Sequence, residues 1–259
     1  MGRNIINKTG EKGINNFGSE MVIVGYRKYS DIDIYFPEYD WTAKGVRYGH
    51  FKNGQIKCPY EPRVFGKGYL GEGSYKAKEN GKTTRVYKSW KGMLQRCYDS
   101  KYHEKKPTYI DCKVDESFHN FQNFGYWDEN NYYEVEDEIM CLDKDILVKH
   151  NKIYSPETCI YVPKTINSLF VKCDNKRGNS VIGTTPFKGK YMVQCWLINP
   201  ETGKSKQEYL GVYDTQEKGF EVYKYYKEKN IKRMADYYLG EIPERLYDAL
   251  YRYEVEITD

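Results

Sequence analysis

Alternation of apolar and polar residues marks the early part of the chain as strand-forming. Ile32, Ile34 and Phe36 alternate with polar neighbours, which is the period-two pattern of a half-buried strand. The compact, β-branched run at residues 21–24 precedes them. Both segments are therefore predicted to be strands of one small sheet.

Turn signals define the limits of this first region. The sequence Lys52-Asn53-Gly54 predicts a hairpin that joins strands at 47–51 and 55–58. Four glycines between residues 66 and 73 close the region, and its polar, Gly/Asn-rich start is typical of a mobile end. We predict a flexible arm over residues 1–17 and a small β domain over residues 18–73.

The helical period replaces the alternation in the middle of the chain. Trp90, Met93, Leu94 and Cys97 lie at i, i+3, i+4 and i+7, which predicts a helix over residues 85–98. No acidic residue interrupts this helix, so its cations form either an ordinary solvated face or a face toward phosphate. These candidate contacts are Lys88, Lys91 and Arg96.

Shorter elements complete this middle domain, which we place at residues 85–171. A strand is predicted at 109–114, and an aromatic helix capped by Ser117 follows it. A second strand at 140–146 enters a loop, and a short helix begins at Pro163. The polar segment 74–84 and the basic segment 172–179 are interpreted as linkers.

The last region, residues 180–259, combines strands with helices. The pattern predicts three strands and then two helices, at residues 181–183, 190–198, 207–213, 215–238 and 243–253. In the second strand, Val193 and Cys195 alternate with Gln194 and Trp196, so one face of the sheet is expected to be buried. The whole chain is therefore predicted to have an α+β fold.

The chain contains strongly basic segments, although its net charge is close to zero. Among 259 residues, 41 Lys and Arg exceed 37 Asp and Glu by only four. Acidic residues concentrate at 128–138 and near the C-terminus, which leaves basic stretches at 85–96, 144–152 and 172–190. Basic stretches of this kind indicate an anionic partner. The 28 tyrosines argue against disorder and suit polar interfaces.

Several classes of protein do not fit the sequence. No run of 18 apolar residues occurs, and the start lacks the apolar core of a secretory signal. Seven cysteines are scattered without a CxxC pair, which argues against a zinc ribbon and favours reduced thiols. We expect a cytoplasmic protein without a membrane partner.

Three motifs in the middle domain resemble HNH homing endonucleases of phages and mobile elements. They lie at residues 87–98, 142–146 and 154–159. The last region resembles an AP2-type DNA-binding domain at Gly183, at Trp196 and in the segment 209–215. The two resemblances cover about residues 80–259. They imply a small N-terminal β unit, a central ββα domain and a C-terminal three-stranded sheet followed by a helix.

The resemblance to HNH enzymes implies a metal-assisted site for phosphodiester cleavage. In such a site a His activates water, while an Asp and an Asn hold one divalent cation. Asp143 matches the metal-binding Asp, but Lys144 stands at the His position and Thr158 at the Asn position. His150 is a candidate replacement base, and Asp145 or Glu157 is a candidate replacement ligand beside Asp143. An active site would hold Mg²⁺ or Mn²⁺, and an inactive one needs no cofactor.

Candidate nucleic-acid contacts lie in the loop after the second strand and in the AP2-like sheet. Lysines of these segments suit phosphate, whereas Gln and Trp suit bases or sugars. In the loop the candidates are Lys149 and Lys152, together with His150. In the sheet they are Lys188, Lys190, Gln194, Trp196, Lys204, Lys206 and Gln207.

Three functions follow from these residues. The first is a phage or mobile-element protein that binds double-stranded DNA in the bacterial host cytoplasm and is cleavage-defective. The second is a metal-dependent nicking or homing endonuclease with a rearranged site. The third is a phage protein that binds and inhibits a host nuclease or defence complex, which the altered catalytic positions and the tyrosines motivate.

Overall fold

A computed structural model describes residues 6–171 and 180–258 of the chain. It divides into two compact units, residues 1–130 and 131–259, which we describe separately. Helices are mixed with several small sheets, which confirms the predicted α+β class. The division falls inside the segment 85–171 that we predicted as one domain. The linker at 172–179 lies outside the described residues.

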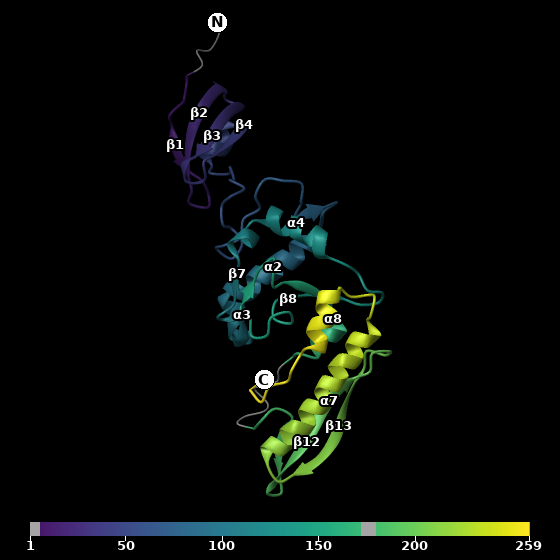
Figure 1. The fold of residues 1–259 in the computed structure, drawn as a ribbon. Helices are drawn as coiled ribbons and strands as arrows, with labels where there is room; N and C mark the ends of the chain where they lie inside the picture. Colours follow the sequence, from purple (N-terminus) through teal and green to yellow (C-terminus); the bar gives the residue numbers. More distant parts are fainter. Residues whose placement is uncertain (1–5, 172–179, 259) are drawn as a thin grey trace. The chain divides into compact units, whose positions relative to one another are not determined.

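An antiparallel sheet with strand order β1-β2-β3-β4 opens the first unit (Figure 1). Its strands are β1 (Lys12–Ile14), β2 (Glu20–Lys28), β3 (Asp31–Phe36) and β4 (Trp41–Val46). Ile32, Ile34 and Phe36 are fully buried, and Met21 and Ile23 of β2 join them in the core. The two predicted strands are therefore confirmed as β2 and β3, and the predicted alternation is confirmed for β3.

Two expectations for this region are wrong. Residues 12–14 do not belong to a flexible arm, because they pair with β2 as the edge strand β1. Residues 48–52 form the helix α1 (Tyr48–Lys52) instead of a hairpin strand, because Phe51 is buried in the core. Gly54 follows α1 with a φ of 64° and donates its N–H to the Phe51 carbonyl oxygen at 3.0 Å.

Helices and three short strands form the rest of the described part of the first unit. Helix α2 (Arg85–Tyr98) has the predicted bounds, and it buries the predicted stripe of Trp90, Met93, Leu94 and Cys97. The Trp90 indole N–H donates to the Phe118 carbonyl oxygen at 2.7 Å. The remaining elements are η1 (Pro37–Tyr39), β5 (Lys78–Glu79), β6 (Lys82–Thr83), α3 (Ser100–Lys105), η2 (Pro107–Tyr109), β7 (Lys113–Val114), η3 (Glu116–His119) and α4 (Phe121–Asn131).

Two of these elements differ from the prediction. The strand predicted at 109–114 is reduced to β7, because the 3₁₀ turn η2 precedes it. The aromatic helix is split into η3 and α4. Its cap is the Asp115 carboxylate, which accepts the Ser117 N–H at 2.9 Å.

The second unit begins with a strand–strand–helix arrangement. Strand β8 (Met140–Asp143) pairs antiparallel with β10 (Ile160–Pro163), and α5 (Lys164–Ser168) follows directly. The short strand β9 (Ile153–Tyr154) lies in the connection. The helix predicted at Pro163 is confirmed as α5. The strand predicted at 140–146 is β8, and it ends at Asp143 rather than at Ile146. This order of elements agrees with the ββα arrangement that the HNH resemblance implies, although it does not establish the family.

A three-stranded antiparallel sheet and two helices complete the second unit. The sheet has the order β11-β12-β13, and its elements are β11 (Thr184–Phe187), β12 (Lys190–Ile198) and β13 (Ser205–Tyr213). The helices are α7 (Gln216–Tyr237) and α8 (Glu244–Tyr251). All but the first strand lie where we predicted them. The first strand begins three residues late, because the Thr184 N–H donates to the Val181 carbonyl oxygen in a turn that contains Gly183.

Helix α7 runs along β12 and β13 (Figure 1) and contributes to two cores. Tyr223 packs with Val193 and Cys195 of the sheet. Further along the helix, Ile231 and Met234 belong to a second core that also contains residues of β10, α5 and α8. One helix therefore links the sheet to the strand–strand–helix arrangement.

No disulfide is assigned among the described cysteines, and Cys173 lies outside the described residues. Among residues 6–171 and 180–258, no helix is both long and apolar enough to cross a bilayer.

A pair of glycine substitutions tests the packing of α7 on the sheet. Gly183 and Gly189 both have a φ of 78°, but a Cβ at Gly183 lies 2.2 Å from the Tyr223 ring, whereas a Cβ at Gly189 meets nothing within 4 Å. Gly189→Ala should cost only backbone strain of about 1 kcal/mol. Gly183→Ala should cost about 1–3 kcal/mol more through overpacking. Urea unfolding followed by circular dichroism measures both, and equal losses would contradict this packing.

Candidate nucleic-acid interface

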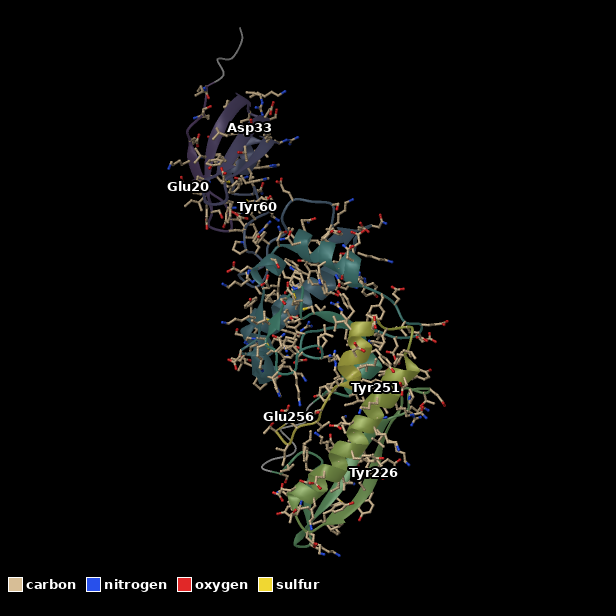
Figure 2. The ribbon with its side chains drawn as sticks, in the orientation of Figure 1. Glu20, Asp33, Tyr60, Tyr226, Tyr251 and Glu256 are labelled. Carbon is tan, nitrogen blue, oxygen red and sulfur yellow. The ribbon has the colours of Figure 1, made fainter. Side chains whose placement is uncertain are left out.

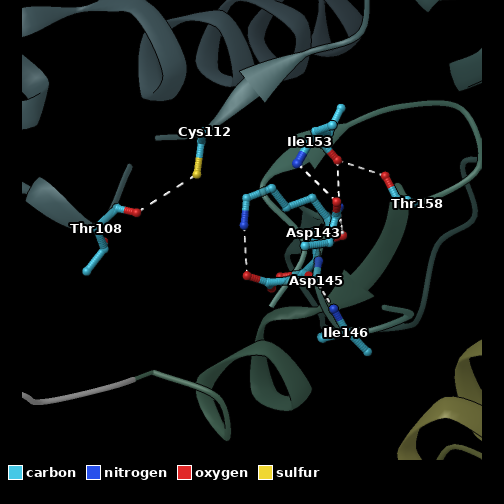
Figure 3. A network of polar contacts seen from close by, with 9 residues as sticks. Thr108, Cys112, Asp143, Asp145, Ile146, Ile153 and Thr158 are labelled. Carbon is cyan, nitrogen blue, oxygen red and sulfur yellow. Dashed lines mark hydrogen bonds and ion pairs between the residues drawn. The ribbon is translucent and has the colours of Figure 1, made fainter. Parts of the chain in front are cut away.

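Asp143 ends β8 and shapes the turn that follows (Figure 3). Its Oδ1 atom accepts the backbone N–H groups of Asp145 and Ile146, each at 2.8 Å. An Asp at this position commonly caps a turn in this way. The carboxylate that we predicted as a metal ligand therefore already has a structural role at one of its oxygens.

The environment of Asp143 disfavours its charged form. Restricted contact with water raises the pKa of Asp143 to about 6, and the negative charge of Asp145 acts in the same direction. The two N–H donors act in the opposite direction without cancelling this shift.

Lys144 is buried at the position that the resemblance assigns to the catalytic His. Its Nζ atom lies 2.8 Å from Oδ2 of Asp145 and 5.7 Å from the centre of the Tyr154 ring. An ammonium group has no lone pair, so it cannot act as the general base that the enzyme family uses.

The two carboxylates that we predicted as metal ligands already have protein partners. Mg²⁺ and Mn²⁺ need oxygen ligands, but Asp145 is paired with the Lys144 ammonium and Asp143 accepts backbone donors. The adjacent positive charge also opposes a metal ion. In the part of the chain that the structure describes, no group of three His, Cys, Asp or Glu side chains could hold one.

The other predicted catalytic positions also have structural partners. The Thr158 hydroxyl donates to the Ile153 carbonyl oxygen at 2.8 Å (Figure 3). His150 has a φ of 63°, and its Nε2 atom lies 3.2 Å from Oε2 of Glu256. The structure therefore places His150 against the C-terminal segment, and Asp143 and Asp145 have other partners.

Asn151 organises this loop, and we did not predict that role. Its Nδ2 group donates to the carbonyl oxygens of Lys144 at 2.7 Å and of Ile153 at 2.6 Å. Its Oδ1 atom accepts the Ile153 N–H at 3.1 Å. An Asn between Lys149-His150 and Lys152 is a turn signal that the sequence could have supplied.

The face of the β11–β13 sheet opposite α7 carries exposed aromatic and amide side chains. Gln194 pairs with Tyr209 and Trp196 pairs with Gln207 across β12 and β13, so the four side chains share one face. Trp196 is 55% exposed and Tyr209 is 60% exposed. The Gln207 amide donates to Oε1 of Gln194 at 3.3 Å. We call these four residues the open quartet.

A β-bulge between β12 and β13 sets which residues of β13 share a face with Gln194 and Trp196. The register shifts between Val193 and Gln194, so Val193 pairs with Gly211 while Gln194 pairs with Tyr209. Leu210, the extra residue, packs with the core on the α7 side. The bulge thereby holds Tyr209 on the exposed face.

The predicted lysines of the sheet lie in three places. Lys190 lies opposite Phe187 on the exposed face and forms an ion pair with Asp214 at 2.8 Å. Lys188 and Lys204 are exposed in the turns at the two ends of β12. Lys206 lies opposite Leu197 on the α7 side and pairs with Glu208 at 2.9 Å, so it does not share the face of the quartet. The exposed Phe187 is a member of that face that we did not predict.

The remaining predicted contacts lie in other places. Lys88 and Lys91 are exposed on α2 and Arg96 is partly buried there, all within the first unit. Lys149 and Lys152 belong to the loop of the second unit. The structure therefore groups the loop and sheet candidates in one unit and the α2 candidates in the other.

No family model matches the chain, and no significant match was found among curated proteins or solved structures. The HNH and AP2 resemblances consequently stay predictions.

The raised pKa of Asp143 predicts a measurable titration. Because its folded pKa lies above that of an unfolded Asp, Asp143 favours folding at low pH, and this contribution declines as pH rises from about 4 to 6. The carboxyl carbon of Asp143 should titrate near pH 6 in an NMR experiment. Asp143→Asn should remove this decline in stability, whereas Asp111→Asn, at an exposed position, should not. A midpoint near pH 4 would contradict the arrangement.

Proposed function

We propose that the chain binds double-stranded DNA through the exposed face of the β11–β13 sheet and does not cleave it. The observation that carries the proposal is the open quartet, in which two amides and two aromatic rings share one exposed face. The phage or mobile-element origin and the bacterial cytoplasm rest on the resemblance alone and belong to the same proposal.

The dimensions and chemistry of this face support a duplex as the partner. The major groove is about 12 Å wide and accepts β-strands, and Gln amides can pair with adenine edges there. The nine residues of β12 span about 30 Å, which exceeds the width of the groove. Lys188 and Lys204, at the two ends of β12, are therefore suited to the phosphates that border the groove.

The chemistry at the end of β8 supports the absence of cleavage. Hydrolysis of a phosphodiester in the resembled family needs a base and a metal ion. Lys144 replaces the base with an ion-paired ammonium, and the hydroxyl of Thr158 is held by the Ile153 carbonyl. The residues that would supply the chemistry instead stabilise the turn.

Loss of one aromatic ring from the quartet should weaken DNA binding. Trp196→Ala should lower the affinity for a labelled duplex roughly tenfold, because exposed aromatic residues contribute strongly to such contacts. Tyr237→Ala is the matched control, since Tyr237 is 47% exposed but lies on α7. Fluorescence anisotropy measures both variants, and equal losses would argue against the quartet.

A second pair of variants tests the lysines. Lys204→Ala should reduce the slope of log affinity against log salt by about one, because one phosphate contact is lost. Lys206→Ala should leave the slope unchanged, because Lys206 pairs with Glu208 on the other face.

Supercoiled plasmid incubated with Mg²⁺ or Mn²⁺ should stay intact. Cleavage that is abolished by Asp143→Ala would instead support the endonuclease. A failure to bind any duplex at low salt, together with a salt-resistant protein partner, would support the third function.

A further inference from the structure

The C-terminal segment contacts the basic loop at Lys149 and His150, two residues that we predicted to meet DNA or substrate. Oε1 of Glu256 lies 3.2 Å from Nζ of Lys149, and Oε2 lies 3.2 Å from Nε2 of His150. The Lys149 ammonium also donates to the Glu254 carbonyl oxygen at 2.7 Å. Both oxygens of one carboxylate therefore face two neighbouring nitrogen donors. Figure 2 labels Glu256 in this segment.

The main chain beside Glu256 is firmly anchored. Val255 is 3% exposed and packs with Val193, Cys195 and Tyr223. Its N–H donates to Oε1 of Glu228 on α7 at 2.8 Å. Because the residue before it is buried, Glu256 has a fixed position from which its side chain reaches the loop.

The loop is held equally well on its own side. Asn151 ties the chain to the Lys144 and Ile153 carbonyl oxygens, as described above. The Lys149 ammonium lies 5.1 Å from the centre of the Tyr253 ring. Lys149 and Glu256 line an open pocket of about 390 Å³, together with residues of the loop, of α8 and of the segment that follows α8. Lys149 and its partner Glu256 thus border open space, and His150 lies next to Lys149 in the chain.

Glu256 and His150 are accessible to competitors, whereas the Lys149 side chain is 23% exposed. The side chain of Glu256 is 49% exposed and that of His150 is 55% exposed. Water and salt weaken such pairs, so the carboxylate is held loosely although its main chain is not. Hydrogen bonds from His150 and Lys149 lower the pKa of Glu256, so this carboxylate is ionised at neutral pH.

A phosphodiester presents the same chemistry as this carboxylate. It carries one negative charge, and its two non-bridging oxygens accept hydrogen bonds from Lys and His in the same way. We propose that Lys149 and His150 form a phosphate-binding site that Glu256 fills in the free protein and that a DNA phosphate takes by displacing it. This inference rests on the proposed function and adds a regulatory contact to it.

Removal of the competing charge tests the site. Glu256→Gln keeps the size of the side chain and should tighten binding to a labelled duplex of about 20 base pairs about two- to fivefold, the range expected for one exposed ion pair. Glu221→Gln on α7 changes the net charge equally at an exposed position and should have a much smaller effect. Fluorescence anisotropy at constant salt compares the variants.

A double-mutant cycle shows whether the gain acts through the proposed partners. In a Lys149→Ala, His150→Ala background, Glu256→Gln should no longer tighten binding. A gain that persists there, or one no larger than that of Glu221→Gln, would overturn the phosphate site. If the wild-type chain and Glu256→Gln both fail to bind duplex, the proposed function itself fails. If the wild-type chain binds and Glu256→Gln binds equally, only the phosphate site fails.

Discussion

The second unit depends on the attachment of β12 to α7 through Asn230. This buried side chain donates from Nδ2 to the Ile198 carbonyl oxygen and accepts the Ile198 N–H at Oδ1, each at 2.9 Å. A buried backbone group without a partner costs about 1–3 kcal/mol, so the pair fixes the end of β12 on the helix. Asn230 also lies between the two parts of α7 that enter the two cores.

Three features of the unit follow from this attachment. Helix α7 covers one face of the sheet, and the opposite face is left with the open quartet. The C-terminal part of α7 packs with β10 and α5. Strand β10 is paired with β8, which ends at Asp143. Glu228 of α7 holds Val255 and so positions Glu256 near the loop. The proposed DNA face and the proposed phosphate site are therefore supported by one helix.

The periodicity of the sequence predicted correctly those elements whose buried residues recur at regular positions along the chain. The stripe of α2 and the alternation in β12 report directly which side chains are buried, and both predictions are confirmed. The hairpin at 47–58 failed because burial of Phe51 decided the conformation, and the turn signal did not. The pairing of His150 with Glu256 joins residues 106 positions apart, and a local pattern contains no information about such contacts. The face of Lys206 depends on a strand register that the sequence did not specify.

Mapping the duplex contact by NMR tests the central claim most directly. Addition of a DNA duplex to ¹⁵N-labelled protein should shift the Trp196 indole N–H signal and the side-chain amide signals of Gln194 and Gln207. Signals from Tyr225 and Lys232, on the outer face of α7, should change little. Shifts confined to α7, or no shifts at a salt concentration where binding is measured, would contradict DNA recognition by the exposed face of the sheet.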